Sequence, residues 1–256
     1  MARKILKNKP LSEAIFELRW TLTETSPKIN VDPYYKLLIG TFYEKVKSDY
    51  PHYEQLPSAA VPEEIASFVV QHRFRKSENE WPLIQIGPGI ITLNDTKDYI
   101  WEDFEQRIGK LLDAFFSTYP HIESLKINSL LLRYLDSVNF DFSNNILDFL
   151  REQMKVTIQL HDNLFSNTGV KTAPENFDLR FSFPSTRPTG LMNLRFVKGK
   201  RPTKEDILVW ETMVQYVGDQ VPNNKKEIAE WVKEAHDLTD DWFSKIIDGE
   251  LQRRFE

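Results

Sequence analysis

The stretch Trp81-Pro-Leu-Ile-Gln-Ile-Gly-Pro-Gly-Ile-Ile-Thr-Leu-Asn94 is the most distinctive part of this chain. Two short apolar runs, Leu83–Ile86 and Ile90–Leu93, flank Gly87-Pro88-Gly89. Glycine can adopt the positive φ of a tight turn and proline fixes its own φ, so the stretch predicts a strand, a turn and a second strand. Because such a hairpin joins antiparallel strands, we expect an antiparallel sheet around it.

Strand and helix patterns extend outward from this hairpin in both directions. The clearest strand pattern is 13–22, where apolar and polar side chains alternate with the period of two that is typical of a half-buried strand. The other expected strands are 67–75, 125–139, 177–184, 191–198 and 206–216. The expected helices are 33–50, 101–119, 145–154 and a closing helix whose apolar stripe runs from Ile228 to Ile246. Residues 51–64 and 161–174 are expected to be loops.

The order of these elements repeats along the chain. Strand, helix, three strands and a long helix describe both 13–119 and 125–253, and Phe16-Glu-Leu-Arg-Trp20 is echoed by Leu130-Leu-Leu-Arg-Tyr134. We therefore predict an α+β fold of two similar halves, residues 1–121 and 122–256, packed as one globular unit. In this prediction an antiparallel sheet carries its helices on one face. A single α+β domain with a coincidental echo is the alternative.

Four segments resemble a sporadically distributed family of uncharacterised prokaryotic proteins. They are Pro10-Leu-Ser-Glu-Ala-Ile-Phe-Glu-Leu-Arg-Trp20, Trp81–Asn94, Tyr99-Ile-Trp101 and Leu132-Arg-Tyr-Leu-Asp136, and Ala235-His236 also fits. The resemblance spans nearly the whole chain and implies a coherent fold, but it brings no established activity. The scattered occurrence of the family suggests a setting among horizontally moving genes, such as defence or toxin–antitoxin neighbourhoods.

Composition limits the classes of function that fit the chain. With 256 residues, 41% of them hydrophobic, it can build a sizeable core, and the absence of cysteine excludes disulfides, thiolate nucleophiles and zinc–thiolate sites. The net charge of −5 makes nucleic acid the less expected partner, because phosphate binding usually needs a basic protein. We see neither a signal peptide nor a membrane span, so the expected location is the cytoplasm, with no membrane partner.

The chain also lacks the usual motifs of catalysis. It has no Gly-x-Ser-x-Gly elbow, and Gly87-Pro88-Gly89 lacks the Gly-Lys-Ser/Thr ending of a phosphate-binding loop. The five histidines are scattered, with none at the spacing of a metal-ligand pair. We therefore assign no catalytic residue, no metal ligand and no cofactor. These absences favour a protein that is not an enzyme, without deciding the question.

Strand arginines are the sharpest functional signal. Period-two alternation predicts that five arginines lie on one open face of the sheet, with Gln85 between them. They are Arg19, Arg73, Arg133, Arg180 and Arg195. Arginine binds phosphate and carboxylate through two parallel hydrogen bonds, so this face could hold an anionic ligand or a protein partner. The alternative is ordinary cross-strand pairing with Glu17, Asp136 and Asp178.

His236 is the one histidine with functional interest. It lies beside the apolar stripe of the closing helix, near Trp231 and Trp242. It is predicted either to line a site there or to be a partly buried histidine bonded to a backbone group.

The leading hypothesis is a non-enzymatic binding or interaction protein, with a defence- or antitoxin-like role, that uses the arginine-bearing face or the groove between the halves. The alternative is a small-molecule-binding fold with a long helix over a sheet. This alternative includes an enzyme of unknown reaction. Nucleic-acid binding is the third and least favoured hypothesis.

Overall fold

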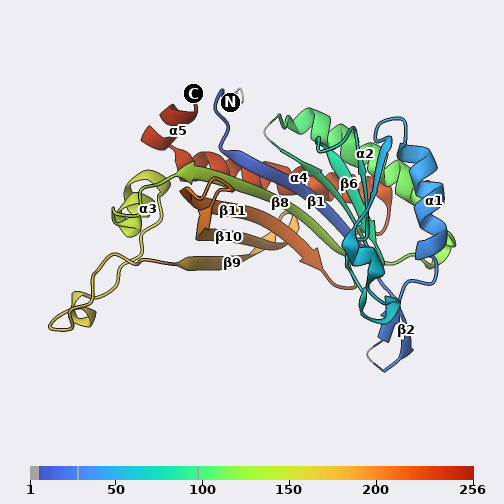
Figure 1. Cartoon of the computed structure of the whole chain (residues 1–256), viewed down its shortest axis with the longest axis horizontal. Helices are drawn as coiled ribbons and strands as arrows, with labels where there is room; N and C mark the ends of the chain where they lie inside the picture. Colours follow the sequence, from blue (N-terminus) through green and yellow to red (C-terminus); the bar gives the residue numbers. More distant parts are fainter. Residues whose placement is uncertain (1–5, 28, 97) are drawn as a thin grey trace.

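The computed structural model describes residues 6–27, 29–96 and 98–256. Its main feature is a nine-stranded sheet in the order β4-β5-β6-β7-β1-β8-β11-β10-β9, in which every neighbouring pair is antiparallel (Figure 1). The strands are β1 (Leu11–Trp20), β4 (His52–Gln55), β5 (His72–Arg75), β6 (Leu83–Gly87), β7 (Ile90–Asp95), β8 (Ile127–Asn139), β9 (Asp178–Thr186), β10 (Thr189–Lys200) and β11 (Asp206–Val217). A separate two-stranded sheet consists of β2 (Thr23–Ser26) and β3 (Ile29–Val31).

Helices cover one face of this sheet (Figure 1). The helices are α1 (Tyr35–Val46), α2 (Trp101–Thr118), α3 (Ile146–Met154), α4 (Lys225–Ile247) and α5 (Glu250–Phe255), and short 3₁₀ turns occur at η1 (Pro57–Ala60), η2 (Glu63–Ile65), η3 (Ile122–Ser124) and η4 (Asp162–Leu164). The buried sides of α1, α2 and the first part of α4 share one apolar cluster with β1 and β8. The end of α4 packs with α3 and α5 in a second cluster around Phe196 and Trp210. The protein is therefore an α+β fold with a large antiparallel sheet.

Alternation along β1 is confirmed. Ala14, Phe16, Leu18 and Trp20 are completely buried against the helices, and the residues between them are partly exposed on the other face. Burying Phe16, Leu18 and Trp20 on one strand contributes on the order of several kcal/mol to folding, because each large apolar side chain contributes about 1.5–3 kcal/mol. This strand lies at the centre of the sheet, between β7 and β8.

The Gly-Pro-Gly hairpin is also confirmed, as the β6–β7 pair. Gly87 pairs with Ile90, and Gly89 has a φ of +78°, a conformation that glycine adopts without strain. A Cβ atom at Gly87 would lie only 1.9 Å from the carbonyl oxygen of Val69. The first glycine is thus required by the close approach of a neighbouring segment, and the second by the turn.

Two predictions for the segments before this hairpin were partly wrong. The strand expected at 67–75 is only β5, because Phe68 has a φ of 61° and breaks the extended backbone before it. The loop expected at 51–64 contains β4, a four-residue strand whose side chains are mostly polar and therefore gave no apolar alternation. The first half accordingly has more strands than the three expected after its first helix.

Candidate functional site

The face of the sheet opposite the helices, called here the open face, carries the strand positions that point away from the core. Its side chains include Ile15, Glu17, Arg19, Glu54, Arg73, Gln85, Asn94, Leu131, Arg133, Leu135, Asp178, Arg180, Arg195, Glu211 and Met213. Directly paired residues on neighbouring antiparallel strands project from the same face, so the ladder fixes which side chains meet.

The ladder places the five strand arginines on this face. Arg133 of β8 lies opposite Ile15 of β1 and Met213 of β11, and Arg195 of β10 lies opposite Glu211 of β11 and Arg180 of β9. Arg19 and Arg73 occupy the same face nearer the other edge of the sheet. The arginines are therefore spread along the sheet and do not converge on one point.

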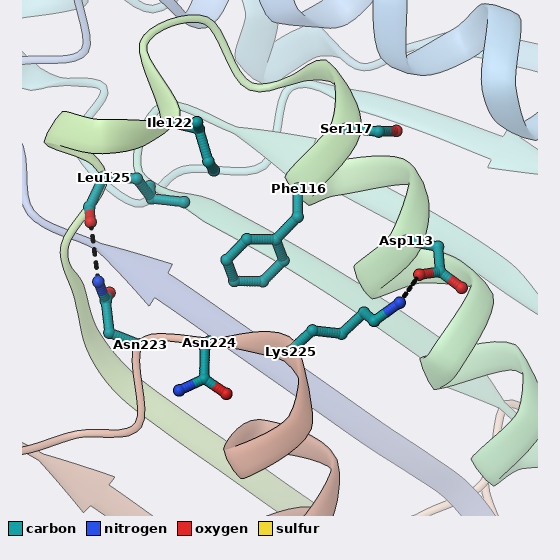
Figure 2. Close-up of a pocket in the computed structure, with 8 residues that line it drawn as sticks. All are labelled: Asp113, Phe116, Ser117, Ile122, Leu125, Asn223, Asn224 and Lys225. Atoms are coloured by element: carbon teal, nitrogen blue, oxygen red, sulfur yellow. Dashed lines mark hydrogen bonds and ion pairs between the residues drawn. The ribbon is translucent and has the colours of Figure 1, made fainter.

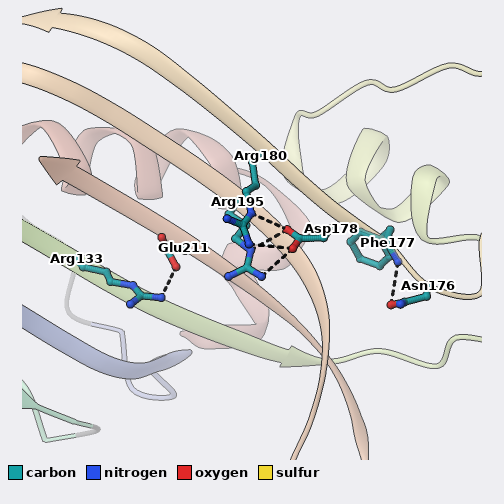
Figure 3. Close-up of polar contacts among 7 residues, drawn as sticks. All are labelled: Arg133, Asn176, Phe177, Asp178, Arg180, Arg195 and Glu211. Atoms are coloured by element: carbon teal, nitrogen blue, oxygen red, sulfur yellow. Dashed lines mark hydrogen bonds and ion pairs between the residues drawn. The ribbon is translucent and has the colours of Figure 1, made fainter. Parts of the chain in front are cut away.

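Asp178 joins two of these arginines at the β9 edge (Figure 3). Arg195 donates to both of its carboxylate oxygens, at 2.7 and 2.8 Å, and Arg180 does so at 3.2 and 3.1 Å. The two guanidinium groups, Arg195 first, hold the pKa of Asp178 well below its usual range. Arg133 donates to Glu211 at 2.5 Å in the same view (Figure 3).

A polar ladder crosses the other half of the open face. Arg73 contacts Glu54 at 3.2 Å and donates to Gln85, and Gln85 in turn donates to Asn94 at 3.4 Å. Asn94 then donates to Glu13 at 2.9 Å. Together with the 2.6 Å contact between Arg19 and Glu17, these bonds give each of the five arginines a partner. Arg73, Arg133 and Arg195 pair across the ladder, as the cross-strand alternative expects, whereas Arg19 and Arg180 pair along their own strands.

The acids that pair with the arginines were only partly identified from the sequence. Glu17 and Asp178 were expected, whereas Glu54 and Glu211 were not, because their positions depend on strand pairing. Asp136 was expected to be available to the arginines, and this was wrong. It shares the buried face of β8 with Leu132 and Tyr134, and its side chain is only 2% exposed.

Arg133 lies among apolar neighbours near the middle of the sheet. Ile15 and Met213 flank it on the adjoining strands, and Leu131 and Leu135 flank it along β8, all of them partly exposed. Its Nε atom is buried and has no hydrogen-bond partner in the part of the chain that the structure describes. Arg133 therefore combines one ion pair with a partly exposed guanidinium group in apolar surroundings.

A pocket of about 590 Å³ opens at one end of the open face. Its lining includes Arg19, Phe68, Lys126, Ser129 and Gln215. The guanidinium carbon of Arg19 lies 5.2 Å from the centre of the Phe68 ring, which fits a cation–π contact. Lys126 is paired with Asp219 at 2.7 Å. Two cations with acidic partners and several neutral donors thus surround the pocket.

A second pocket, of about 500 Å³, lies between α2, η3 and the start of α4 (Figure 2). Asn223 accepts from the backbone N–H of Ile127 at 2.7 Å and donates to the carbonyl of Leu125 at 3.1 Å. Asn224 caps α4, and Lys225 pairs with Asp113. These contacts join α4 to α2 and to the start of β8, so we assign this pocket a structural role.

His236 lies on the other side of the sheet from the arginines. It is 4% exposed, its ring stacks on Trp101 with 3.6 Å between ring centres, and its Nδ1 hydrogen bonds with the Tyr134 hydroxyl at 2.9 Å. The Tyr134 hydroxyl is thus a side-chain partner of the ring. Trp231 instead donates to the carbonyl of Thr189, and Trp242 contacts Phe183. His236 lines neither of the two pockets above.

The described residues include no group of three or more His, Asp or Glu side chains placed to hold a metal ion. None of the helices in the described ranges is long and apolar enough to cross a membrane. No protein-family model matches the chain, and no curated protein matches it.

Proposed function

We propose that the chain is a non-enzymatic binding protein and that the open face docks a protein partner. The observation that carries the proposal is the composition of this face, where paired opposite charges alternate with partly exposed apolar side chains. Protein interfaces combine these features, with an apolar centre and a polar rim whose charges find partners.

The charge balance supports a protein partner over nucleic acid. Arg195 and Arg180 share Asp178, and Arg133 has Glu211, so the arginines do not form a positive patch. Binding to a nucleic acid backbone draws its affinity from cations that replace released counterions. A face whose cations already have acidic neighbours, on a chain of net charge −5, offers little of that driving force.

Arg133 is the proposed anchor of the docking surface. Binding energy in interfaces concentrates in a few arginine and aromatic residues that are surrounded by apolar contacts. Ile15, Leu131 and Met213 provide such surroundings, and the Arg133 side chain, 32% exposed, can donate to a partner's carbonyl or carboxylate beside its bond to Glu211.

The two-half organisation belongs to the same proposal. Counting outward from the centre, the strand order is β1-β7-β6-β5-β4 on one side and β8-β11-β10-β9 on the other; apart from the additional edge strand β4, the two orders correspond, which supports a duplicated unit. The sequence echo makes Glu17 the counterpart of Leu131, and these two residues lie directly opposite each other in the ladder. A two-fold relation between halves 1–121 and 122–256 requires that such equivalent residues of the two halves lie opposite each other at the axis. The family resemblance and its defence or toxin–antitoxin setting likewise remain proposals.

Capture of partners from native lysate tests the docking surface. We expect that the wild-type chain retains a protein that Arg133→Glu loses, because the substitution places a like charge beside Glu211 in the apolar centre. Arg187→Glu is the matched control, since Arg187 pairs with Glu234 and its side chain is 83% exposed outside the open face. Equal retention by both variants, each folded by circular dichroism, would contradict the proposal.

The pocket beside Arg19 supports a second candidate, the binding of a small anionic molecule. Its volume of about 590 Å³ falls within the range of ligand sites. Equilibrium dialysis against a metabolite extract, analysed by mass spectrometry, would show enrichment of an anion that Arg19→Ala abolishes. Conversion of such a molecule into a product would overturn the non-enzymatic assignment.

A further inference from the structure

The two edge strands of the sheet differ in length. β4 forms one edge with four residues and lies between Pro51 and Pro57, so it offers a short ladder to other chains. β9 forms the other edge with nine residues, and no described strand pairs with its outer side. A long unpaired edge presents a row of backbone N–H and C=O groups that can bind another strand.

The first half of the chain has a strand at the corresponding place. The segment between α1 and β5 contributes β4, which pairs with the outer side of β5. The segment between α3 and β9, residues 155–177, contains no strand and extends away from the body of the protein (Figure 1). This segment leaves the outer side of β9 open and exposes Leu160, Leu164 and Val170.

We propose that the edge formed by β9 and the three residues before it, 175–177, pairs antiparallel with the same edge of a second copy of this chain, about a two-fold axis at Leu179. The two sheets then continue into one another with their open faces on the same side. Isologous pairing of identical edges is the simplest closed assembly that an edge strand can form, because each copy satisfies the other. This inference does not depend on the identity of the partner that docks on the open face.

Charge complementarity selects the register. Paired residues must project from the same face, so the axis passes through a residue. An axis at Leu179 places Asp178 of each copy opposite Arg180 of the other, whereas an axis at Arg180 would oppose two like charges. On the helix-covered side, the same register pairs Leu179 with Leu179 of the other copy and Phe177 with Phe181. All three side chains are partly exposed in the single chain.

Two prolines support the same register. Pro174 and Pro184 are equally far along the chain from Leu179, so an axis there places each opposite the other. Proline has no N–H group to donate to a ladder and is found where strand pairing ends. The prolines would therefore bound a paired stretch of residues 175–183 on both chains, in which residues 175–177, outside β9 in the single chain, extend the strand. An axis at Phe181 would instead place Pro184 opposite Asp178, inside the ladder.

The absence of cysteine makes a direct test possible. Opposed residues in antiparallel strands have Cα atoms about 4.5–5.5 Å apart, within the range of a disulfide. We expect Leu179→Cys to form a disulfide-linked dimer under mild oxidation. The double variant Asn176→Cys/Ser182→Cys should also cross-link, whereas Ser182→Cys alone should not, because its expected neighbour is then Asn176.

Sedimentation measures the assembly without cross-links. The unmodified chain should sediment as a dimer, and Arg180→Asp should weaken the dimer about tenfold or more, because it sets two carboxylates opposite each other. Arg187→Asp, outside the paired stretch, should leave it unchanged. A monomer at all concentrations, or cross-linking of Phe181→Cys in place of Leu179→Cys, would overturn the proposal.

Discussion

Asp136 of β8 lies directly opposite Trp210 of β11, and both side chains are buried on the helix-covered face. The indole Nε1 of Trp210 has no hydrogen-bond partner in the described part of the chain. Burial raises the pKa of Asp136 to about 8, from an ordinary value of 3.8. The carboxyl group is therefore held neutral in the core at neutral pH.

Asp136 should make the free energy of unfolding fall as the pH rises. The unfolded chain releases this proton near pH 4 and the folded chain only near pH 8. Stability from this group is therefore complete below about pH 4 and is lost between pH 4 and 8, by up to about 1.4 kcal/mol per pH unit. Urea unfolding of the wild type and of Asp136→Asn at pH 5 to 8 should show a shallower decline in the variant. Parallel declines would contradict the burial argument.

Gly87→Ala should destabilise the central hairpin. The new methyl group would meet the Val69 carbonyl oxygen at 1.9 Å, and relief requires the backbone to move, so we expect a loss of about 2–4 kcal/mol. Gly109→Ala is the matched control, because nothing lies within 4 Å of its Cβ position and alanine favours a helix by about 0.5–1 kcal/mol. Thermal unfolding should lower the melting temperature of the first variant and raise that of the second.

His236→Ala should lower stability without affecting the open face. The variant loses the stack on Trp101 and the hydrogen bond to Tyr134, which together should cost about 2–4 kcal/mol. His161→Ala, at an exposed position, should change stability little. Loss of partner capture by folded His236→Ala would instead indicate that the histidine belongs to a functional site.

The pKa of Asp178 should respond to Arg195 more than to any other arginine. Arg195 is the first cause of the lowered pKa, through two short hydrogen bonds. Replacement by Gln should shift the carboxyl titration, followed by NMR, upward toward the ordinary value of 3.8. Arg133→Gln should leave it unchanged, because Arg133 pairs with Glu211.

Local patterns predicted much of the fold. The Gly87-Pro88-Gly89 turn, the alternation of β1 and the apolar stripes of α2 and α4 each depend on neighbours within a few residues. Local patterns did not predict the pairing of β1 with β8 or the strand β4, because both depend on contacts between distant segments. Element order alone could not specify those contacts.

The arginine partners show the same limit at the candidate site. Alternation placed Arg133 and Arg195 on one face, but Glu211 could be assigned to them only once the β8–β11–β10 register was known. Asp136 is different, because its even spacing from Leu132 and Tyr134 already indicated the buried face. That signal was present in the sequence and was outweighed by the expectation that a carboxylate pairs with an arginine.

The paired charges of the open face also bear on how fast a partner can bind. Each arginine beside an acid produces a field that cancels within a few ångströms, so the face exerts little attraction over a Debye length of about 8 Å at physiological salt. Association then proceeds without long-range steering, and its rate constant should change little between low and high ionic strength. Selectivity for the partner must therefore arise after encounter, from short-range fit around Arg133.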